Sequence, residues 1–252
     1  MNHSARVSSI KVPEVTLVFW LIKIAATTLG ETAGDAVSMS MGLGYLAATA
    51  VFGVLLVIAV GAQIRASRFN PWLYWAAIIA TTTVGTTLAD FADRSLGIGY
   101  PGGSLLLLGL LLGSLFAWHR TLGSVAITSV ASTPAEIFYW VTILFSQTLG
   151  TALGDWTADS AGLGYVGGIA IFVALLALVA AAYRWTRLSR TSLFWAAFVL
   201  TRPLGAVVGD FLDKPLSAGG LDLSRFGASA ALMIFILAAI AVSPQRPAAN
   251  TH

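Results

Sequence analysis

The sequence predicts an all-α, polytopic membrane protein of eight transmembrane helices, built from four tandem copies of a two-helix repeat. Of its 252 residues, 57% are hydrophobic and only 10% are charged, whereas soluble domains carry roughly 25% charged residues. The apolar residues gather in blocks of about 17 to 22 residues, the length that an α-helix needs to cross ~30 Å of hydrocarbon. Because lipid cannot satisfy an open backbone, blocks of this length indicate helices.

One residue pattern recurs four times. In each copy an aspartate follows a tryptophan by 15 residues: Trp20–Asp35, Trp75–Asp90, Trp140–Asp155 and Trp195–Asp210. A glycine precedes each aspartate by five residues, and a glycine or alanine stands directly before it. The first three copies continue into a Gly-x-Gly-Tyr turn. A repeat of this kind predicts one structural unit used four times.

The predicted spans alternate between helices that contain the tryptophan and helices that follow the turn. In order they are 14–34, 45–63, 71–90, 103–118, 134–154, 166–182, 192–211 and 227–243. The first resembles a secretory signal because Arg6 and Lys11 precede it. It lacks a small-residue cleavage pattern, however, and it recurs three more times, so we expect a structural helix.

The spacing of the tryptophans divides the chain into two halves, residues 1–126 and 127–252. The steps between tryptophans are 55, 65 and 55 residues, so the first copy maps onto the third, and the second onto the fourth, by 120 residues. Each repeat contains an even number of spans, and all four repeats therefore share one orientation. The predicted pseudo-symmetry axis lies along the membrane normal, unlike that of an inverted-repeat transporter.

A chain of four tandem repeats, each with two transmembrane segments and a characteristic tryptophan, resembles a family of bacterial membrane proteins known as a repeat of unknown function. The resemblance covers residues 14 to 243 and implies an inner-membrane protein without an assigned activity. The fourth copy departs from the pattern. It has Arg202-Pro203 where the first copy has Thr27-Thr28, and it lacks the Gly-x-Gly-Tyr turn.

Basic loop residues predict the orientation of the chain. Nine lie in the terminal segments or after the second, fourth and sixth spans: Arg6, Lys11, Arg65, Arg68, Arg120, Arg184, Arg187, Arg190 and Arg246. The opposite loops hold three: Arg94, Lys214 and Arg225. The positive-inside rule therefore places both termini in the cytoplasm. We expect a protein of the bacterial inner membrane whose immediate partner is the lipid bilayer.

Each odd-numbered span carries a polar stripe. Positions 3, 7, 11 and 15 after the tryptophan share one helix face because residues four apart are neighbours. In order the stripes are Lys23-Thr27-Glu31-Asp35, Ile78-Thr82-Thr86-Asp90, Ile143-Gln147-Thr151-Asp155 and Phe198-Arg202-Ala206-Asp210. Small residues at positions 10 and 14 allow close helix packing. We therefore expect an inner ring of odd spans, with their stripes turned inward and the even spans outside.

The four repeat aspartates lie at helix C-termini, where the helix dipole disfavours a carboxylate. A bound cation, a positive side chain or protonation would compensate. One interpretation is a cation site with oxygen ligands from Asp35, Asp90, Asp155 and Asp210. The alternative is that each aspartate caps a short external helix or turns the chain before the glycine-rich segment.

Three charged residues lie away from the ends of the predicted spans, within the bilayer: Lys23, Glu31 and Arg202. Such a charge costs about 2.5–3.5 kcal/mol even on the translocon-insertion scale, and it indicates a functional site by default. Arg202 and Glu31 differ by one turn in depth, so we expect a pair, either functional or purely structural. Lys23 lies deeper toward the cytoplasmic side. We expect it to pair with Glu14 or Glu136, to extend to the membrane interface, or to face a water-filled cavity.

These features favour a transporter or channel for a small ion, and the acidic outer ends of the odd spans favour a cation. The alternative is a non-transporting scaffold or regulatory subunit. We expect no enzyme and no cofactor, because His3, His119 and His252 fall outside the predicted spans. Scattered basic residues argue against nucleic acid as a partner, and the absence of cysteine excludes disulfides and thiolate metal sites. An oligomer is compatible with the sequence.

Overall fold

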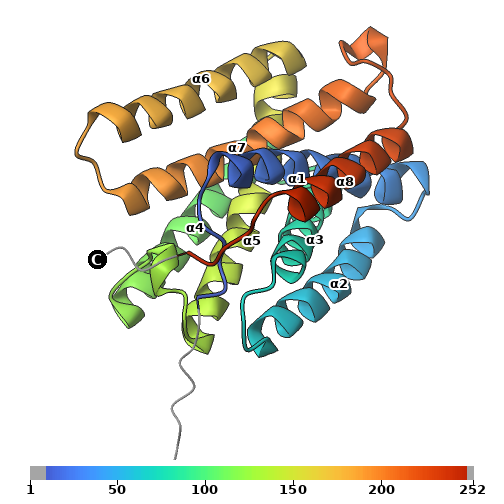
Figure 1. Cartoon of the computed structure of the whole chain (residues 1–252). Helices are drawn as coiled ribbons and strands as arrows, with labels where there is room; N and C mark the ends of the chain where they lie inside the picture. Colours follow the sequence, from blue (N-terminus) through green and yellow to red (C-terminus); the bar gives the residue numbers. More distant parts are fainter. Residues whose placement is uncertain (1–9, 249–252) are drawn as a thin grey trace, which may run out of the picture.

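The computed structural model describes residues 10–248, which form an all-α bundle (Figure 1). Its long helices are α1 (Leu17–Asp35), α2 (Tyr45–Arg65), α3 (Pro71–Asp90), α4 (Tyr100–Leu122), α5 (Thr133–Asp155), α6 (Gly164–Trp185), α7 (Arg190–Asp213) and α8 (Arg225–Val242). Each coincides with one predicted span. The largest difference is at the end of α4, predicted at residue 118 and observed at residue 122.

Within the described residues, seven helical segments are long and apolar enough to cross a membrane, against the eight spans predicted. The exception is α3. It contains five threonines, together with Pro71 and two tryptophans, and these residues lower its mean hydropathy. It nevertheless occupies the same place in the repeat as α1, α5 and α7.

The ends of the odd helices follow from local sequence. Each begins with a side-chain cap, from Thr16, Asn70, Ser132 or Ser189. After the repeat aspartate, the first three continue as one π-helical turn: η1 (Ala36–Ser40), η2 (Phe91–Ser95) and η4 (Trp156–Ser160). The glycines that follow reverse the chain. Gly42 and Gly44, for example, have φ values of 70° and 75°, which glycine adopts without strain.

The fourth repeat ends differently, as its sequence predicts. Helix α7 runs on to Asp213, and the 3-10 turn η5 (Leu216–Ala218) replaces the π-helical turn and the Gly-x-Gly segment. A further 3-10 turn, η3 (Ile127–Ser129), lies in the connection between the two halves of the sequence.

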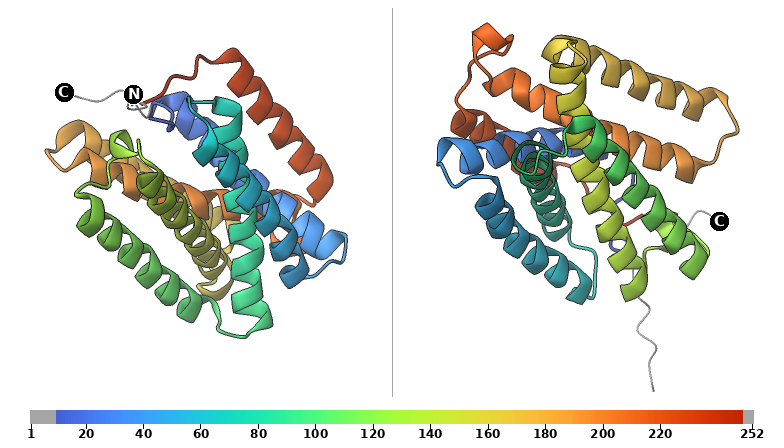
Figure 2. Two further views of the ribbon diagram at one scale, coloured as in Figure 1. Left: turned by 90° about the horizontal axis from the view of Figure 1, so that it is seen from below. Right: turned by 180° about the vertical axis from the view of Figure 1, so that it is seen from behind.

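The odd helices form a closed ring. Helix α1 packs on α3, α3 on α5, α5 on α7, and α7 returns to α1 (Figures 1 and 2). Each even helix packs outside the ring, on the odd helix of the following repeat: α2 on α3, α4 on α5, α6 on α7 and α8 on α1. The two halves of the sequence therefore interlock, through α4 against α5 and through α8 against α1.

Burial separates the two sets of helices. Within their most apolar windows, 61% to 67% of the residues of α1, α5 and α7 are buried, against 6% to 28% for α2, α4, α6 and α8. The outward faces of the even helices are apolar, with Val57 and Leu105 each 72% exposed and Phe116 67% exposed. The predicted inner ring and outer layer are confirmed.

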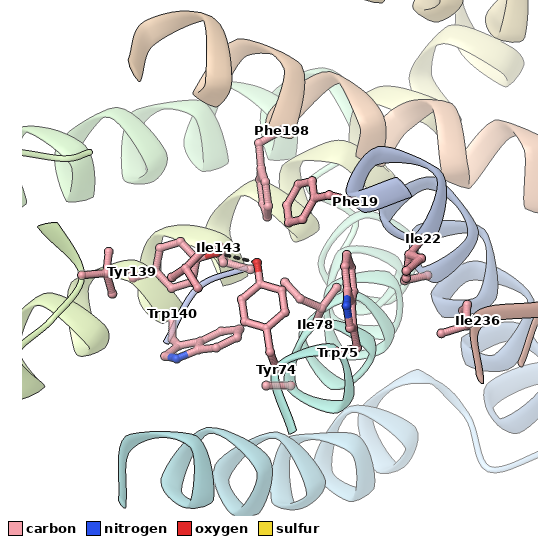
Figure 3. Close-up of a cluster of buried hydrophobic side chains, with 14 of the residues drawn as sticks. Phe19, Ile22, Tyr74, Trp75, Ile78, Tyr139, Trp140, Ile143, Phe198 and Ile236 are labelled. Carbon is pink, nitrogen blue, oxygen red and sulfur yellow. Dashed lines mark hydrogen bonds between the residues drawn. The ribbon is translucent and has the colours of Figure 1, made fainter. Parts of the chain in front are cut away.

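The N-terminal ends of the odd helices meet in an aromatic cluster (Figure 3). Tyr74 and Tyr139 share a hydrogen bond of 2.7 Å between their hydroxyls, and Phe19 and Trp75 pack with ring centroids 5.4 Å apart. The terminal segments pair at this end: the amide of Glu14 donates to the carbonyl of Arg246 at 2.8 Å. Both described ends of the chain therefore lie on one face. Of the basic residues used to predict orientation, Arg6 lies outside the described part.

Candidate functional site

The four polar stripes line the axis of the ring. None of their sixteen residues is more than 4% exposed. The stripes form four layers, one for each position after the tryptophan. Position 3 holds three apolar residues and Lys23, position 7 holds polar residues and Arg202, position 11 holds Glu31 with two threonines and Ala206, and position 15 holds the aspartates.

Glycine sets the register between neighbouring odd helices. In every repeat, a Cβ added at the position-10 glycine would overlap the position-7 residue of the next repeat. The pairs are Gly30 with Thr82, Gly85 with Gln147, Gly150 with Arg202, and Gly205 with Thr27. The last pair joins α7 to α1 and closes the ring. The predicted close packing through small residues is confirmed.

Arg202 links α7 to the other three odd helices. Its Nη2 lies 3.0 Å from Glu31 Oε2 and 2.6 Å from Thr86 Oγ1, and it also donates to Thr151 Oγ1. These three partners all occupy position 11 of their repeats. The fourth residue at that position, Ala206, contributes only a methyl group. The expected pair between Arg202 and Glu31 is present, fully buried at the centre of the ring.

Several buried polar atoms beside this pair have no hydrogen-bond partner among the described residues. They are Nε and Nη1 of Arg202, Nε2 and Oε1 of Gln147, and Oγ1 of Thr82. Gln147 and Thr82 occupy position 7 of their repeats, as Arg202 does. Unpaired buried polar atoms are costly and mark places where water or an ion completes a site.

Lys23 meets neither of the carboxylates expected to pair with it. Its side chain is fully buried, its Nζ lies 3.3 Å from Thr201 Oγ1, and it sits 4.1 Å from the ring centroid of Phe198. Within the described residues no carboxylate pairs with it, and it does not reach the surface. Glu136 pairs instead with Lys11, at 2.6 Å.

Two basic side chains bridge the four aspartates in pairs. Lys214 Nζ lies 2.9 Å from both Asp35 and Asp210. Arg94 lies 2.9 Å from Asp90 and 3.1 Å from Asp155. Adding 120 residues to Arg94 gives Lys214, so the two bridges are equivalent in the two halves of the sequence. A positive side chain is thus the compensation that these carboxylates receive.

The aspartates do not act as helix caps. Asp35, Asp90 and Asp155 make no side-chain capping hydrogen bond to the π-helical turns that follow them, and Asp210 lies within α7. The backbone continues as helix through each of these positions, which leaves no free amide for the carboxylate to accept from. The capping alternative is wrong for these residues.

Lys214 lies just beyond the end of α7, against several carboxylates. Burial lowers its pKa, but the negative charges of Asp210 and Asp35 raise it more, and the net pKa lies above the ordinary value for lysine. Lys214 is therefore charged at neutral pH. Arg225 adds a second positive group here, 3.0 Å from Asp213 and 3.6 Å from Asp35.

The candidate cation ligands separate into two clusters. Glu31, Asp35 and Asp210 place one carboxylate oxygen each within 4.8 Å of one another, a grouping that could hold a metal ion. Asp90 and Asp155 lie instead on either side of Arg94. A site that uses all four aspartates stays a prediction, and Glu31 is an additional candidate ligand.

The residues that pair with the aspartates, and the contacts of Lys11, were not predicted from the sequence. Arg94 and Lys214 each follow an aspartate by four residues, a spacing that favours ion pairs on a helix and was available in the sequence. Lys11 also donates to the carbonyls of Gln63 and Ile64, at 3.0 Å each, at the end of α2. No local pattern marks that long-range contact.

The described histidine lies away from the ring. His119 was expected outside the helices, but it occupies the last turns of α4, where it is exposed. The other two histidines, His3 and His252, lie outside the described residues.

Comparison with known proteins gives a family and no activity. A family model described as a repeat of unknown function (DUF347) matches the chain four times, over residues 18–69, 73–124, 138–189 and 193–243. Each match covers one repeat, that is, an odd helix of the ring and the even helix that follows it in the sequence. No curated protein and no solved structure matches the chain.

Proposed function

We propose that this chain, which belongs to the family built from the repeat of unknown function DUF347, spans the bacterial inner membrane and carries a small ion along the axis of its ring. Both termini lie in the cytoplasm in this proposal, and the aspartates lie at the outer end. The favoured ion is a cation. The protein acts without an enzymatic step and without a cofactor.

The surface of the outer layer supports insertion into a bilayer. The even helices expose long apolar faces around the ring, including Ile58 at 62%, Leu178 at 65% and Ile234 at 67%. A soluble monomer rarely exposes continuous apolar patches beyond a few hundred Å². In a membrane the same faces contact lipid at no cost, while the buried odd helices keep their polar groups inside.

The single observation that carries the transport proposal is the buried Arg202–Glu31 pair with its unpaired polar neighbours. Replacing a buried ion pair by well-packed apolar residues is often neutral or stabilising. A ring that served only as an anchor would have no need of this pair, nor of Gln147 without a hydrogen-bond partner. Intramembrane charges of this kind commonly mark an ion pathway.

The outer end of the axis supports the preference for a cation. Each pair of aspartates already holds one positive group, Lys214 or Arg94, between its carboxylates. A mobile cation would take the same oxygens once the tethered side chain moves aside. Ile78, Ile143 and Phe198 are fully buried at position 3 of their stripes, so an ion on this path requires them to move.

Ion flux into vesicles tests this proposal. We would reconstitute the full chain and measure uptake of sodium, potassium and calcium with ion-sensitive dyes. We expect uptake of one of these cations, with a loss of at least severalfold in Asp35→Asn and Asp155→Asn, because asparagine keeps the volume and removes the charge. The matched control is Asp222→Asn: Asp222 is exposed at a φ of 55°, a conformation that asparagine also tolerates. Full activity of folded ring variants would contradict the cation pathway.

A non-transporting scaffold is the second candidate, and the filled axis favours it. Every stripe side chain is buried, and Arg202 contacts all three of the other odd helices, as a structural pin would. This alternative predicts no flux of any of the three cations in the folded wild-type protein. It also predicts that the ring variants change stability alone.

A further inference from the structure

We propose that a groove between α1, α6 and α7 binds one anionic phospholipid from the leaflet on the side of the chain termini. The acyl chain lies in the groove and the phosphate meets the arginines at its mouth. This inference rests on the membrane insertion proposed above, and it goes beyond ion transport because it assigns a separate ligand and site.

The groove has the size and lining of an acyl-chain site. Its volume is about 620 Å³, within the 300–1,000 Å³ typical of small-molecule pockets. Its walls are mainly apolar, with contributions from Leu17, Ile24, Leu176, Val179, Phe194 and Ala197. It lies on the outer side of the ring, where lipid is the surrounding medium in the proposed orientation.

The depth of the groove matches one leaflet. On α7, beyond Arg190 at the mouth, its lining runs from Thr191 to Thr201, a rise of about 15 Å along the helix. Half of a ~30 Å hydrocarbon core has the same thickness. A chain that enters at the Thr191 end would therefore reach the middle of the bilayer at Thr201.

The charge at the mouth selects an anionic headgroup. Arg184, Arg187 and Arg190 lie within seven residues, all exposed, with no acidic residue between them. Arg190 lines the groove, and its guanidinium stacks over Tyr183 at 4.1 Å from the ring centroid. No carboxylate among the described residues pairs with these arginines. Guanidinium groups bind phosphate in bidentate fashion, and basic pockets between cytoplasmic helix ends suit anionic lipids.

The deep end of the groove touches the polar axis. Thr201 lines the groove and also receives the hydrogen bond from the buried Lys23, at 3.3 Å. An acyl chain in the groove would therefore pack against the residue that holds Lys23. Phe194 of the lining also packs on Phe198, with ring centroids 5.6 Å apart, and Phe198 lies under the Lys23 ammonium.

Native mass spectrometry of the full chain in detergent tests the inference with phosphatidylglycerol and phosphatidylcholine as probes. We expect one phosphatidylglycerol to bind in preference to phosphatidylcholine. Ala197→Trp, which fills the groove, should abolish binding, while Ala50→Trp on the exposed face of α2 should leave it unchanged. Arg190→Gln should reduce the affinity for phosphatidylglycerol about fivefold, with little effect on phosphatidylcholine, and Arg68→Gln in the corresponding loop after α2 should have no effect.

Equal binding of the two lipids by the wild type, or wild-type binding by Ala197→Trp, would overturn the inference. If Ala197→Trp fails to fold, wild-type affinity for phosphatidylglycerol in Arg190→Gln would overturn it alone. The assay needs no ion flux. A protein that binds the lipid but moves no ion would contradict the transport proposal alone, and the reverse result would contradict only the lipid site.

Discussion

Gly150 of α5 lies directly against the side chain of Arg202 on α7, and a Cβ at Gly150 would overlap the Cβ and Cγ of that arginine. The contact is one of four equivalent contacts around the ring. It positions the Cβ and Cγ atoms of the arginine, and the guanidinium then contacts Glu31, Thr86 and Thr151. Packing between two neighbouring helices and the central charge cluster therefore depend on the same glycine.

Gly150→Ala is expected to destabilise the protein by about 1–3 kcal/mol, the range for overpacking a close contact. The overlapped atoms are near the backbone of Arg202 and cannot move aside as the end of a flexible side chain could. Gly109→Ala is the control, because a Cβ there meets nothing within 4 Å. Thermal unfolding in detergent measures the difference. Equal melting temperatures for the two variants would contradict the proposed packing of the ring.

The Arg202–Glu31 pair is expected to behave as a coupled unit. Arg202→Met leaves Glu31 buried without its counter-charge, and Glu31→Gln does the same to Arg202, so each should cost about 3–5 kcal/mol. The double variant removes both charges and should be more stable than the sum of the single effects predicts. A double-mutant cycle by chemical denaturation in mixed micelles measures this coupling. Additive effects would mean that the two side chains do not interact as described.

The sequence predicted the parts of the fold that repeat at a fixed spacing. The eight helices, the inner ring and the inward stripes all follow from the tryptophan, glycine and aspartate positions. The Arg202–Glu31 pair follows because residues one turn apart in depth can meet across a ring. The residues that line the axis were therefore predictable from the repeat pattern, together with the substitutions that distinguish one copy from another.

The packing of the even helices was not predictable in the same way. Their sequences are apolar on every side, so no polar face marks which odd helix each one contacts. The structure places α2 on α3 rather than on α1, and it closes the circle with α8 on α1. The environment of Lys23 was also missed, because a threonine hydroxyl and the face of Phe198 leave no signature in the sequence.

Lys214→Met is expected to lower stability by about 3 kcal/mol, at the lower end of the range for a broken buried pair because Lys214 is 15% exposed. The change leaves Asp35 and Asp210 facing each other without the ammonium between them. Lys214→Arg keeps the charge and should recover most of the loss. Similar stability of the methionine variant and the wild type would show that the bridge contributes nothing.

The effect of Lys214 has a defined dependence on pH. Its folded-state pKa lies above the ordinary value of 10.5, so its stabilisation is fully present below that value and is lost as the pH rises through the folded pKa. The difference in unfolding free energy between wild type and Lys214→Met should therefore stay constant from about pH 7 to about pH 10. A difference that falls within this interval would contradict the raised pKa.

The accessibility of single cysteines reports whether the ring spans the membrane with its aspartates at the outer end. The chain contains no cysteine, and four exposed serines mark the two faces: Ser95 and Ser217 beside the aspartates, and Ser67 and Ser189 at the opposite end. Each is replaced by cysteine in turn and treated with an impermeant thiol reagent in intact cells. We expect labelling at residues 95 and 217 in intact cells, and at residues 67 and 189 only after the membrane is opened. Labelling of residue 67 or 189 in intact cells, or recovery of the protein in the soluble fraction, would contradict it.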